Sequence, residues 1–352
     1  MAIVKRQLFT GPEAWLGKDV QNSDHWKFSL NDAEISEIDA SLTSFKALQI
    51  DWRDMQAGNF PLPGLRATLD KVAEELENGS GMARVTGLPS KKYSEPDLRA
   101  VWFALGLHIG NPLYQDCNGL LMRDIEDRQE DTDTLQGHHL TTKQDETFIS
   151  SKARTLSNGT LRFHTDRCDV VALLCVNPAR EGGVSKIASS VTVRNLIVER
   201  HPELADVLYQ PIPRSRLGEE KGGEDMHYLL PVFGEREGKF TSHYSKTYIE
   251  AAHEMRSAPD ISDQQWQAIE MLHEVAEEVC MQMTMAAGDI QFLNNHIIYH
   301  ARTEFHDTPA DPGRQLHRLW LAMPNSRSLP KDQSVLWRKT EAGSLRGGIG
   351  QS

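Results

Sequence analysis

The stretch Leu161-Arg162-Phe163-His164-Thr165-Asp166 carries the strongest structural signal in the chain. On a β-strand, residues i and i+2 point to the same face, so the side chains of His164 and Asp166 can reach one metal ion. An isolated His-x-Asp triplet is weak evidence, because a chain with 14 histidines contains such triplets by chance. Here the triplet lies between two apolar runs, as expected at the mouth of a β-barrel. We therefore interpret His164 and Asp166 as candidate metal ligands.

The third candidate ligand is His300, which closes a stretch that begins with the turn Gly288-Asp289. His296 is an alternative, because His296 and His300 would share one face of a helix, as in some zinc sites. The β-branched and aromatic residues nearby favour a strand, and no glutamate lies beside His296 to act as a base. We therefore prefer His300, although a buried structural histidine is the alternative for either residue. Two histidines and one carboxylate are the set that holds non-haem Fe(II) and leaves other coordination positions open.

Two arginines, Arg314 and Arg318, follow His300 along the chain. Residues four apart on a strand point the same way, so both guanidinium groups can enter one pocket. Two like charges that face inward are costly unless anions meet them. This spacing predicts two carboxylate-type ligands, one for each arginine. The alternative is a pair of surface arginines on an edge strand.

Short β-type runs separated by turns dominate the chain from about residue 120, and they predict a barrel or jelly roll. The expected strands are 82–87, 120–125, 161–164, 170–176, 228–233, 290–293 and 316–323. Apolar residues at helical spacing predict helices over 65–76, 95–106, 193–209 and 263–283. The fold class expected is α+β.

No repeat or low-complexity linker divides the chain, so one elaborated domain is favoured. We expect an N-terminal arm and helix over 1–75, a catalytic domain over 76–330 and a C-terminal tail over 331–352. Residues 126–158 are charged and poor in apolar side chains, which is typical of an active-site lid. A helical insertion is expected over about 191–283.

Composition narrows the choice of partners and compartment. Lys and Arg total 38 against 50 Asp and Glu, a net charge of −12 that argues against nucleic acid or an anionic membrane as a partner. The four cysteines form no CxxC pair, and neither a signal sequence nor a spanning apolar run is present. A cytoplasmic location is expected. Arginines in a pocket can still attract a small anion against the mean charge.

These motifs resemble the taurine/2,4-dichlorophenoxyacetate dioxygenase (TauD/TfdA) family of Fe(II)- and 2-oxoglutarate-dependent oxygenases, over roughly residues 80 to 325. The likeness rests on residues 163–166, on Glu181-Gly182-Gly183-Val184-Ser185, on 288–300 and on Arg314-x-x-x-Arg318. It implies the clavaminate synthase-like fold, with a double-stranded β-helix (jelly-roll) core, flanking helices and a lid.

The resemblance also implies roles for individual residues. His164, Asp166 and His300 would bind iron. Arg314, assisted by the hydroxyl of Ser185, would hold the distal carboxylate of 2-oxoglutarate. Ser185 stands where the family often has threonine.

On the substrate side, the resemblance assigns Arg318 to the anionic group of the substrate. Tyr114 and Gln115 lie in the region that lines the substrate in relatives. The sulfonate-binding histidine of taurine-specific members has no equivalent there, since Gly110-Asn111 stands in its place. Taurine itself is therefore not the expected substrate, and Cys168 is expected to pack near the iron without binding it.

The function expected is hydroxylation of an unactivated C–H bond of a small carboxylate, amino acid or sulfonate, with O2 consumed and succinate and CO2 released. Desaturation, ring closure or C–X cleavage would begin in the same way. A zinc hydrolase or isomerase, a non-catalytic anion-binding barrel and a protein-modifying oxygenase are the alternatives. A homo-oligomer is expected only by analogy with related folds.

Overall fold

The computed structural model describes residues 7–128, 155–216, 224–308, 310–311 and 313–350. Most of the expected lid, residues 129–154, lies outside the described residues. No helix in the described part of the chain is long and apolar enough to cross a bilayer.

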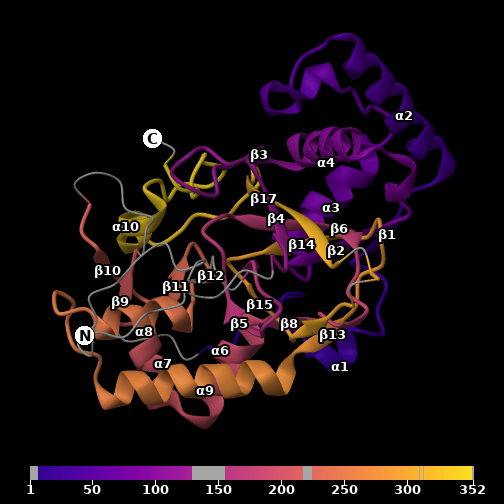
Figure 1. Cartoon of the computed structure of the whole chain (residues 1–352). Coiled ribbons are helices and arrows are strands. Elements are labelled where there is room, and N and C mark those ends of the chain that lie inside the picture. The colour runs from indigo at the N-terminus through magenta and orange to yellow at the C-terminus, as the bar shows by residue number, and fades with distance from the viewer. Residues whose placement is uncertain (1–6, 129–154, 217–223, 309, 312, 351–352) are drawn as a thin grey trace.

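Two β-sheets form the centre of the molecule (Figure 1). The larger sheet has seven strands in the order β1-β2-β14-β6-β17-β3, with β4 also paired to β17. Its strands are β1 (Lys27–Ser29), β2 (Met82–Thr86), β3 (Asn111–Pro112), β4 (Met122–Glu126), β6 (Val170–Asn177), β14 (Ile290–Asn294) and β17 (Gln315–Ala322). The smaller sheet has four strands in the order β13-β8-β15-β5. They are β5 (Leu161–His164), β8 (Ser185–Ser189), β13 (Met281–Met283) and β15 (Ile298–Arg302).

Alternation along the strands gives the larger sheet two apolar faces. On β6, Val170, Ala172 and Leu174 pack against the N-terminal helices, whereas Val171 belongs to the core shared with the smaller sheet. This period of two is what a strand buried on both sides requires. The jelly-roll core expected from the sequence is confirmed, and the space between the sheets is where inward side chains converge.

Three helices cover the outer face of the larger sheet: α2 (Asp32–Ala47), α3 (Arg66–Asn78) and α4 (Glu95–Ile109). Helix α4 begins as predicted, with the Ser94 hydroxyl accepting from the Asp97 amide and Pro96 in the first turn. The N-terminal arm expected from the sequence contains a long helix, α2, that was not predicted. Its Asn31/Glu34 capping box was present in the sequence, and Ile38, Leu42 and Phe45 bury its inner face.

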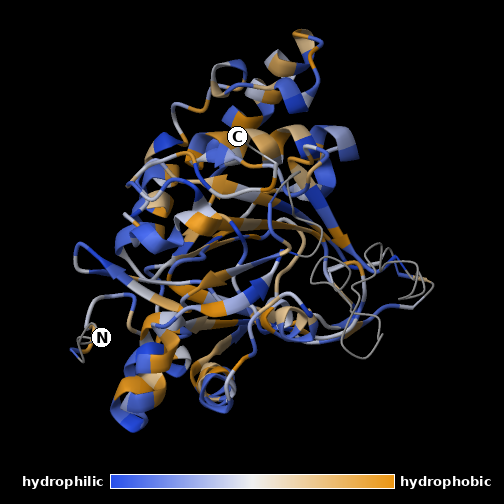
Figure 2. Cartoon of the chain, turned by 90° about the vertical axis from the view of Figure 1, so that its left-hand side faces the viewer, coloured by the Kyte–Doolittle hydropathy of each residue, from blue (hydrophilic) through white to orange (hydrophobic). Residues whose placement is uncertain are grey.

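Four helices and two hairpins pack beside the smaller sheet. They are α6 (Ser190–Arg200), α7 (Pro202–Leu208), α8 (Lys246–Glu254), α9 (Asp263–Val279), β9 (Ile212–Ser215) with β10 (His227–Leu230), and β11 (Phe233–Arg236) with β12 (Lys239–Ser242). The insertion over 191–283 is therefore not purely helical. Figure 2 shows hydrophobic and hydrophilic residues mixed along the outer helices, as expected for helices that bury one side.

Three predicted elements end differently in the structure. The helix expected over 193–209 is broken between α6 and α7, because the residue before Pro202 disfavours helical backbone. The strand expected over 228–233 is divided at Pro231, which has no amide hydrogen to donate. The helix expected to reach 283 ends at Val279, and Met281–Met283 instead pairs with β8, burying alternate residues.

The remaining elements are short. They are α1 (Gly17–Val20), the strand pair β7 (Glu181–Gly182) and β16 (Phe305–His306), α10 (Ser334–Trp337), and 3-10 turns at Trp52–Asp54, Ala57–Asn59, Ser90–Lys92 and Lys331–Gln333. The C-terminal segment is not a loose tail, because Trp337, Arg346 and Ile349 are all buried.

Candidate metal centre and oxo-acid pocket

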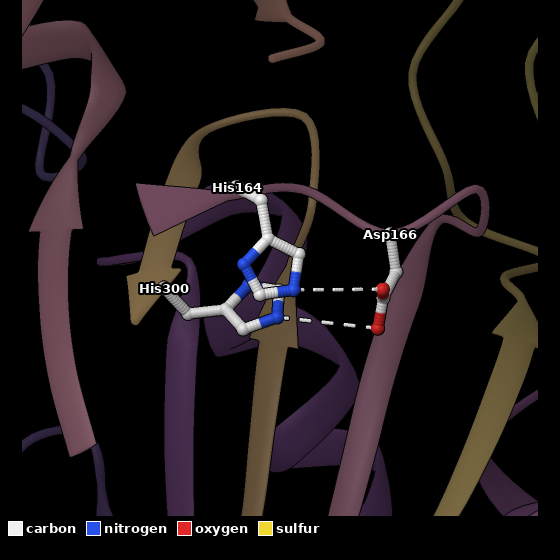
Figure 3. A group of neighbouring side chains, drawn as sticks. All are labelled: His164, Asp166 and His300. Carbon is white, nitrogen blue, oxygen red and sulfur yellow. Dashed lines mark ion pairs between the residues drawn. The ribbon is translucent and has the colours of Figure 1, made fainter. Parts of the chain in front are cut away.

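Three side chains from distant parts of the sequence meet between the two sheets: His164, Asp166 and His300 (Figure 3). His164 ends β5, Asp166 follows it, and His300 lies opposite His164 on β15. The Nε2 atoms of His164 and His300 lie 3.8 Å and 3.9 Å from the two carboxylate oxygens of Asp166. One ligand atom from each residue falls within 4.8 Å of the others, close enough to share one ion.

The protonation states of this group suit a divalent cation. Burial, and next the adjacent His164, lower the pKa of His300 to about 3. Burial also lowers the pKa of His164. Burial raises the pKa of the Asp166 carboxyl, but nearby cations, Arg318 foremost, outweigh this effect and hold the pKa below its ordinary value. Neutral imidazoles and an ionised carboxylate are the forms that bind metal.

Hydrogen bonds fix the direction of two of the ligands. The Nδ1 of His164 lies 2.9 Å from the carbonyl of Arg162, so Nδ1 carries the proton and the Nε2 lone pair faces Asp166. The Asp166 amide donates to the Asn295 side chain at 3.0 Å. Trp320 Nε1 donates to Asp166 Oδ2 at 3.0 Å, leaving Oδ1 free of these contacts. Such orienting partners are typical of metal sites in proteins.

A cavity adjoins the triad, and His164, Asp166 and His300 all line it. Both predicted arginines, Arg314 and Arg318, line it, as does Ser185. Arg318 lies on β17, Arg314 immediately precedes this strand, and both side chains line the same cavity. The guanidinium of Arg314 forms no ion pair with a described carboxylate, and its buried Nη1 has no hydrogen-bond partner among the described residues. Burial lowers the pKa of Arg314 to about 10, so it stays charged at neutral pH.

Arg318 differs from Arg314, because a carboxylate already contacts it. Its Nη1 lies 3.3 Å from Asp166 Oδ2, and its Nε donates to the Gln115 side chain at 2.8 Å. The expectation that each arginine needs an anion from outside the protein is therefore wrong for Arg318 in this structure. A divalent metal on Asp166 would share that carboxylate and weaken its hold on Arg318.

The two weaker substrate candidates lie elsewhere. Gln115 is buried and bonds to the protein at both ends of its amide, to Arg318 and to the Leu121 carbonyl. Tyr114 is half-buried. Neither residue lines the described cavity.

Two cationic residues at this site were not predicted. Arg302 lines the cavity two residues after His300, on the same face of β15. The alternation that linked His164 to Asp166 was the signal that could have found it. Arg123 on β4 pairs directly with Arg318 in the larger sheet, so the two side chains share a face. Register across strands is not readable from one sequence.

His296, the alternative to His300 as third ligand, and Cys168 contact residues other than the three candidate ligands. His296 Nε2 lies 2.7 Å from the Asp169 carboxylate, and its Nδ1 contacts the Thr241 hydroxyl. Cys168 is fully buried and accepts from Asn295, and burial raises its pKa well above the ordinary value. A protonated thiol is a poor metal ligand, in keeping with the packing role expected for it.

Jelly-roll sheets, a buried His-Asp-His group and an adjoining cationic pocket define a non-haem iron oxygenase. The sequence matches the family described as "Taurine catabolism dioxygenase TauD, TfdA family" over residues 44–320. The chain belongs to this family. It is an oxidoreductase that uses Fe(II), 2-oxoglutarate and O2.

Curated relatives match nearly the whole chain. The FR-33289 synthase of Streptomyces rubellomurinus is 24% identical over 343 residues, covering 95% of this chain and 96% of the relative. A taurine hydroxylase-like protein, SAT17, of Stachybotrys chartarum is 26% identical over 329 residues, covering 92% and 80%.

Solved structures share the fold at low identity. An asparagine oxygenase with Fe(II), 3-hydroxyasparagine and succinate has a TM-score of 0.63 at 16% identity, covering 91% of this chain and 100% of its own. The oxygenase OrfP with iron and alpha-ketoglutaric acid, which is 2-oxoglutarate, has a TM-score of 0.61 at 16% identity, covering 86% and 95%.

Proposed function

We propose that this enzyme hydroxylates an unactivated C–H bond of a small substrate that carries an anionic group. His164, Asp166 and His300 hold the Fe(II) ion in this proposal, and 2-oxoglutarate is converted to succinate and CO2. The observation that carries the proposal is the shared cavity. The His-Asp-His group and the unpaired guanidinium of Arg314 line the same space.

Arg314 and Ser185 are the proposed contacts of the distal carboxylate of 2-oxoglutarate. Arg314 supplies a buried charge and an unpaired donor, and Ser185 supplies a hydroxyl at the same cavity wall. A planar guanidinium matches a carboxylate with two parallel hydrogen bonds. The glycine turn before Ser185 packs directly against Arg314, so the backbone helps to fix the direction of the guanidinium.

Arg318 is the proposed contact of the anionic group of the substrate. Arg123 supports this assignment, because its buried guanidinium lies beside Arg318 and its Nε has no partner among the described residues. The Asp116 carboxylate lies 3.3 Å from Arg123 Nη2 and partly offsets the charge of this arginine. Gln115 acts through Arg318, holding its Nε, and a direct substrate contact by Tyr114 stays a prediction.

Fe(II) held by His164, Asp166 and His300 would supply the redox chemistry that couples consumption of O2 and the oxo acid to oxidation of the substrate. The residues of the chain supply orientation and a dry site. Asn295 and Trp320 keep Asp166 directed at the metal position. Arg314 and Arg318 hold the two organic molecules by their charged groups, which sets the position of the reacting C–H bond.

The names of the structural neighbours support hydroxylation of a small acid. The asparagine oxygenase structure contains 3-hydroxyasparagine, and an OrfP structure contains (3S)-hydroxy-L-arginine. Both compounds are hydroxylated amino acids with a carboxylate. We carry over the reaction type and the anionic group, and leave the identity of the substrate open.

A screen of carboxylates, sulfonates and amino acids for substrate-stimulated O2 uptake tests the proposal. We expect stimulation by at least one anionic compound, with succinate formed in proportion and a hydroxylated product detected by mass spectrometry. A product that has lost two hydrogens, or has been cleaved, would contradict hydroxylation while leaving the oxygenase class intact. If neutral compounds stimulate succinate formation and no anionic compound does, the proposed role of Arg318 is wrong.

A further inference from the structure

We propose that Arg302 is a second cationic contact for the distal carboxylate of the oxo acid, and that it couples cosubstrate binding to residues 157–159, which lead into β5. The proposal rests on the proposed function, because that function supplies the oxo acid. It adds a residue to the pocket and gives the pocket a mechanical link to the strand that carries His164.

The position of Arg302 places it in the oxo-acid half of the cavity. It lies on β15 and pairs directly with Ser185 on β8, so the two side chains share a face of the smaller sheet. Arg314 lines the same cavity from the larger sheet. Arg302 on β15, Ser185 on β8 and Arg314 just before β17 therefore converge on one space.

One hydrogen-bond donor of Arg302 has no acceptor among the described residues, as expected for a side chain that binds an anion. Its Nη2 donates to the carbonyls of Ser157, at 2.9 Å, and Gly159. Its Nε is buried without a partner among the described residues, as is Nη1 of Arg314. The charge of Asp127 acts on Arg302 through space, but no described carboxylate lies in ion-pair contact with Arg302. A buried donor left unpaired is destabilising, and more so when it is charged.

Phe305 brings the two arginines together. Its ring centre lies 4.8 Å from the guanidinium carbon of Arg302 and 5.1 Å from that of Arg314. Two buried cations against one ring repel each other, and a carboxylate shared between them would relieve the repulsion. Contact with the Phe305 ring limits the freedom of both guanidinium groups.

The same residues hold the segment that precedes β5. Arg302 binds the carbonyls of Ser157 and Gly159, and the amide of Phe305 donates to the carbonyl of Asn158 at 3.1 Å. An anion that fixes Arg302 therefore also fixes the two carbonyls that Arg302 binds, on either side of Asn158. Residues 157–159 should become more ordered when the distal carboxylate binds.

The first test compares two oxo acids by calorimetry, in protein loaded with Fe(II) under nitrogen. One is 2-oxoglutarate, and the other is 2-oxobutyrate, which lacks the distal carboxylate. We expect Arg302→Gln to reduce the preference for 2-oxoglutarate by tenfold or more, and Arg302→Lys to reduce it less. The matched control is Arg236→Gln, because Arg236 also donates to two backbone carbonyls, those of Leu329 and Thr340, but lies outside the cavity.

An equal loss of affinity for both oxo acids in Arg302→Gln would overturn the proposal, because it would show a purely structural role. The second test needs no variant and so does not depend on how well one folds. Hydrogen exchange of the backbone amides over 157–161 is measured in the wild-type protein with each oxo acid. We expect protection with 2-oxoglutarate and little with 2-oxobutyrate, and equal protection would contradict the coupling.

Failure of the inference is distinct from failure of the proposed function. If Arg314→Gln abolishes the preference for 2-oxoglutarate while Arg302→Gln leaves it unchanged, the pocket stands and the role of Arg302 falls. If wild-type protein with Fe(II) binds neither oxo acid, the proposed function itself is wrong.

Discussion

At the scale of single residues, Arg314 holds a buried charge that no described carboxylate pairs with. Replacing it by glutamine should weaken 2-oxoglutarate binding by about 2–5 kcal/mol, roughly 30-fold or more, because a buried ion pair loses one partner. Calorimetry under nitrogen measures the change. Arg180→Gln is the control, since Arg180 is an exposed arginine near the same end of the sheet. Equal affinity in Arg314→Gln and wild type would remove Arg314 from the pocket.

Gly183 offers a separate test of the same pocket. Its φ is +62°, and an added Cβ would lie 3.0 Å from Arg314 Nε. Gly183→Ala should therefore lower stability by about 1–2 kcal/mol through backbone strain and also weaken 2-oxoglutarate binding by moving Arg314. Gly238→Ala is the matched control, because Gly238 has φ +77° and nothing within 4 Å of its added Cβ. If both variants bind 2-oxoglutarate like wild type, Arg314 does not depend on this turn.

The buried side chain of His243 should make the free energy of unfolding depend on pH. It is fully buried, Arg214 donates to its Nδ1 at 2.6 Å, and burial followed by Arg214 lowers its pKa well below the ordinary value. Below about pH 6.5 the His243 imidazole takes up a proton in the unfolded chain but not in the folded chain. The contribution of His243 to the free energy of unfolding is therefore full above that pH and is lost as the pH falls.

His243→Gln should therefore make the loss of stability between pH 6.5 and 5 shallower by up to about 1.4 kcal/mol per pH unit. Urea unfolding at several pH values measures the slope. His306→Gln, at an exposed histidine, should leave the slope unchanged. An unaltered slope in His243→Gln would show that another group carries the acid sensitivity.

At the scale of elements, the C-terminal segment holds the loop that carries Asp166. Arg346 Nε lies 2.8 Å from the Asp169 carboxylate, which also contacts His296 at 2.7 Å. The amide of Gly348 donates to the carbonyl of Arg167 at 2.8 Å. Residues 334–350 are therefore part of the support of the metal centre.

Breaking this buried pair should destabilise the protein strongly. Arg346→Gln leaves Asp169 with an uncompensated charge beside His296, and we expect a loss of about 3–5 kcal/mol in urea unfolding. Lys339→Gln, at an exposed cation in the same segment, should change stability little. A loss below about 1 kcal/mol in Arg346→Gln would show that the segment does not brace the loop.

Local patterns predicted the elements that carry the site, and long-range contacts explain the rest. The spacings of His164 and Asp166 and of Arg314 and Arg318 are visible in a single sequence, although Asp166 lies just after β5 and Arg314 just before β17. The pairing of Arg123 with Arg318, and of Arg302 with Ser185, depends on strand register. The breaks before Pro202 and at Pro231 were visible in the sequence but were outweighed by apolar periodicity.

At the scale of the whole molecule, two apolar cores lie on the two faces of the larger sheet, and the metal centre lies between the sheets. A ligand that binds only the folded chain stabilises it by mass action. Removal of metal by a chelator should lower the melting temperature, and Mn(II) at 100 times its Kd should restore about 2.7 kcal/mol. Asp166→Ala should show no such response. The same response in that variant would mean that the ion binds elsewhere.

Anaerobic equilibrium dialysis with Fe(II) tests the central claim most directly, because the account depends on one ion shared by His164, Asp166 and His300. We expect wild-type protein to bind a single ferrous ion per chain, and His300→Ala and Asp166→Ala, each shown to be folded, to lose nearly all of it. Undiminished iron binding in either folded variant would contradict the account.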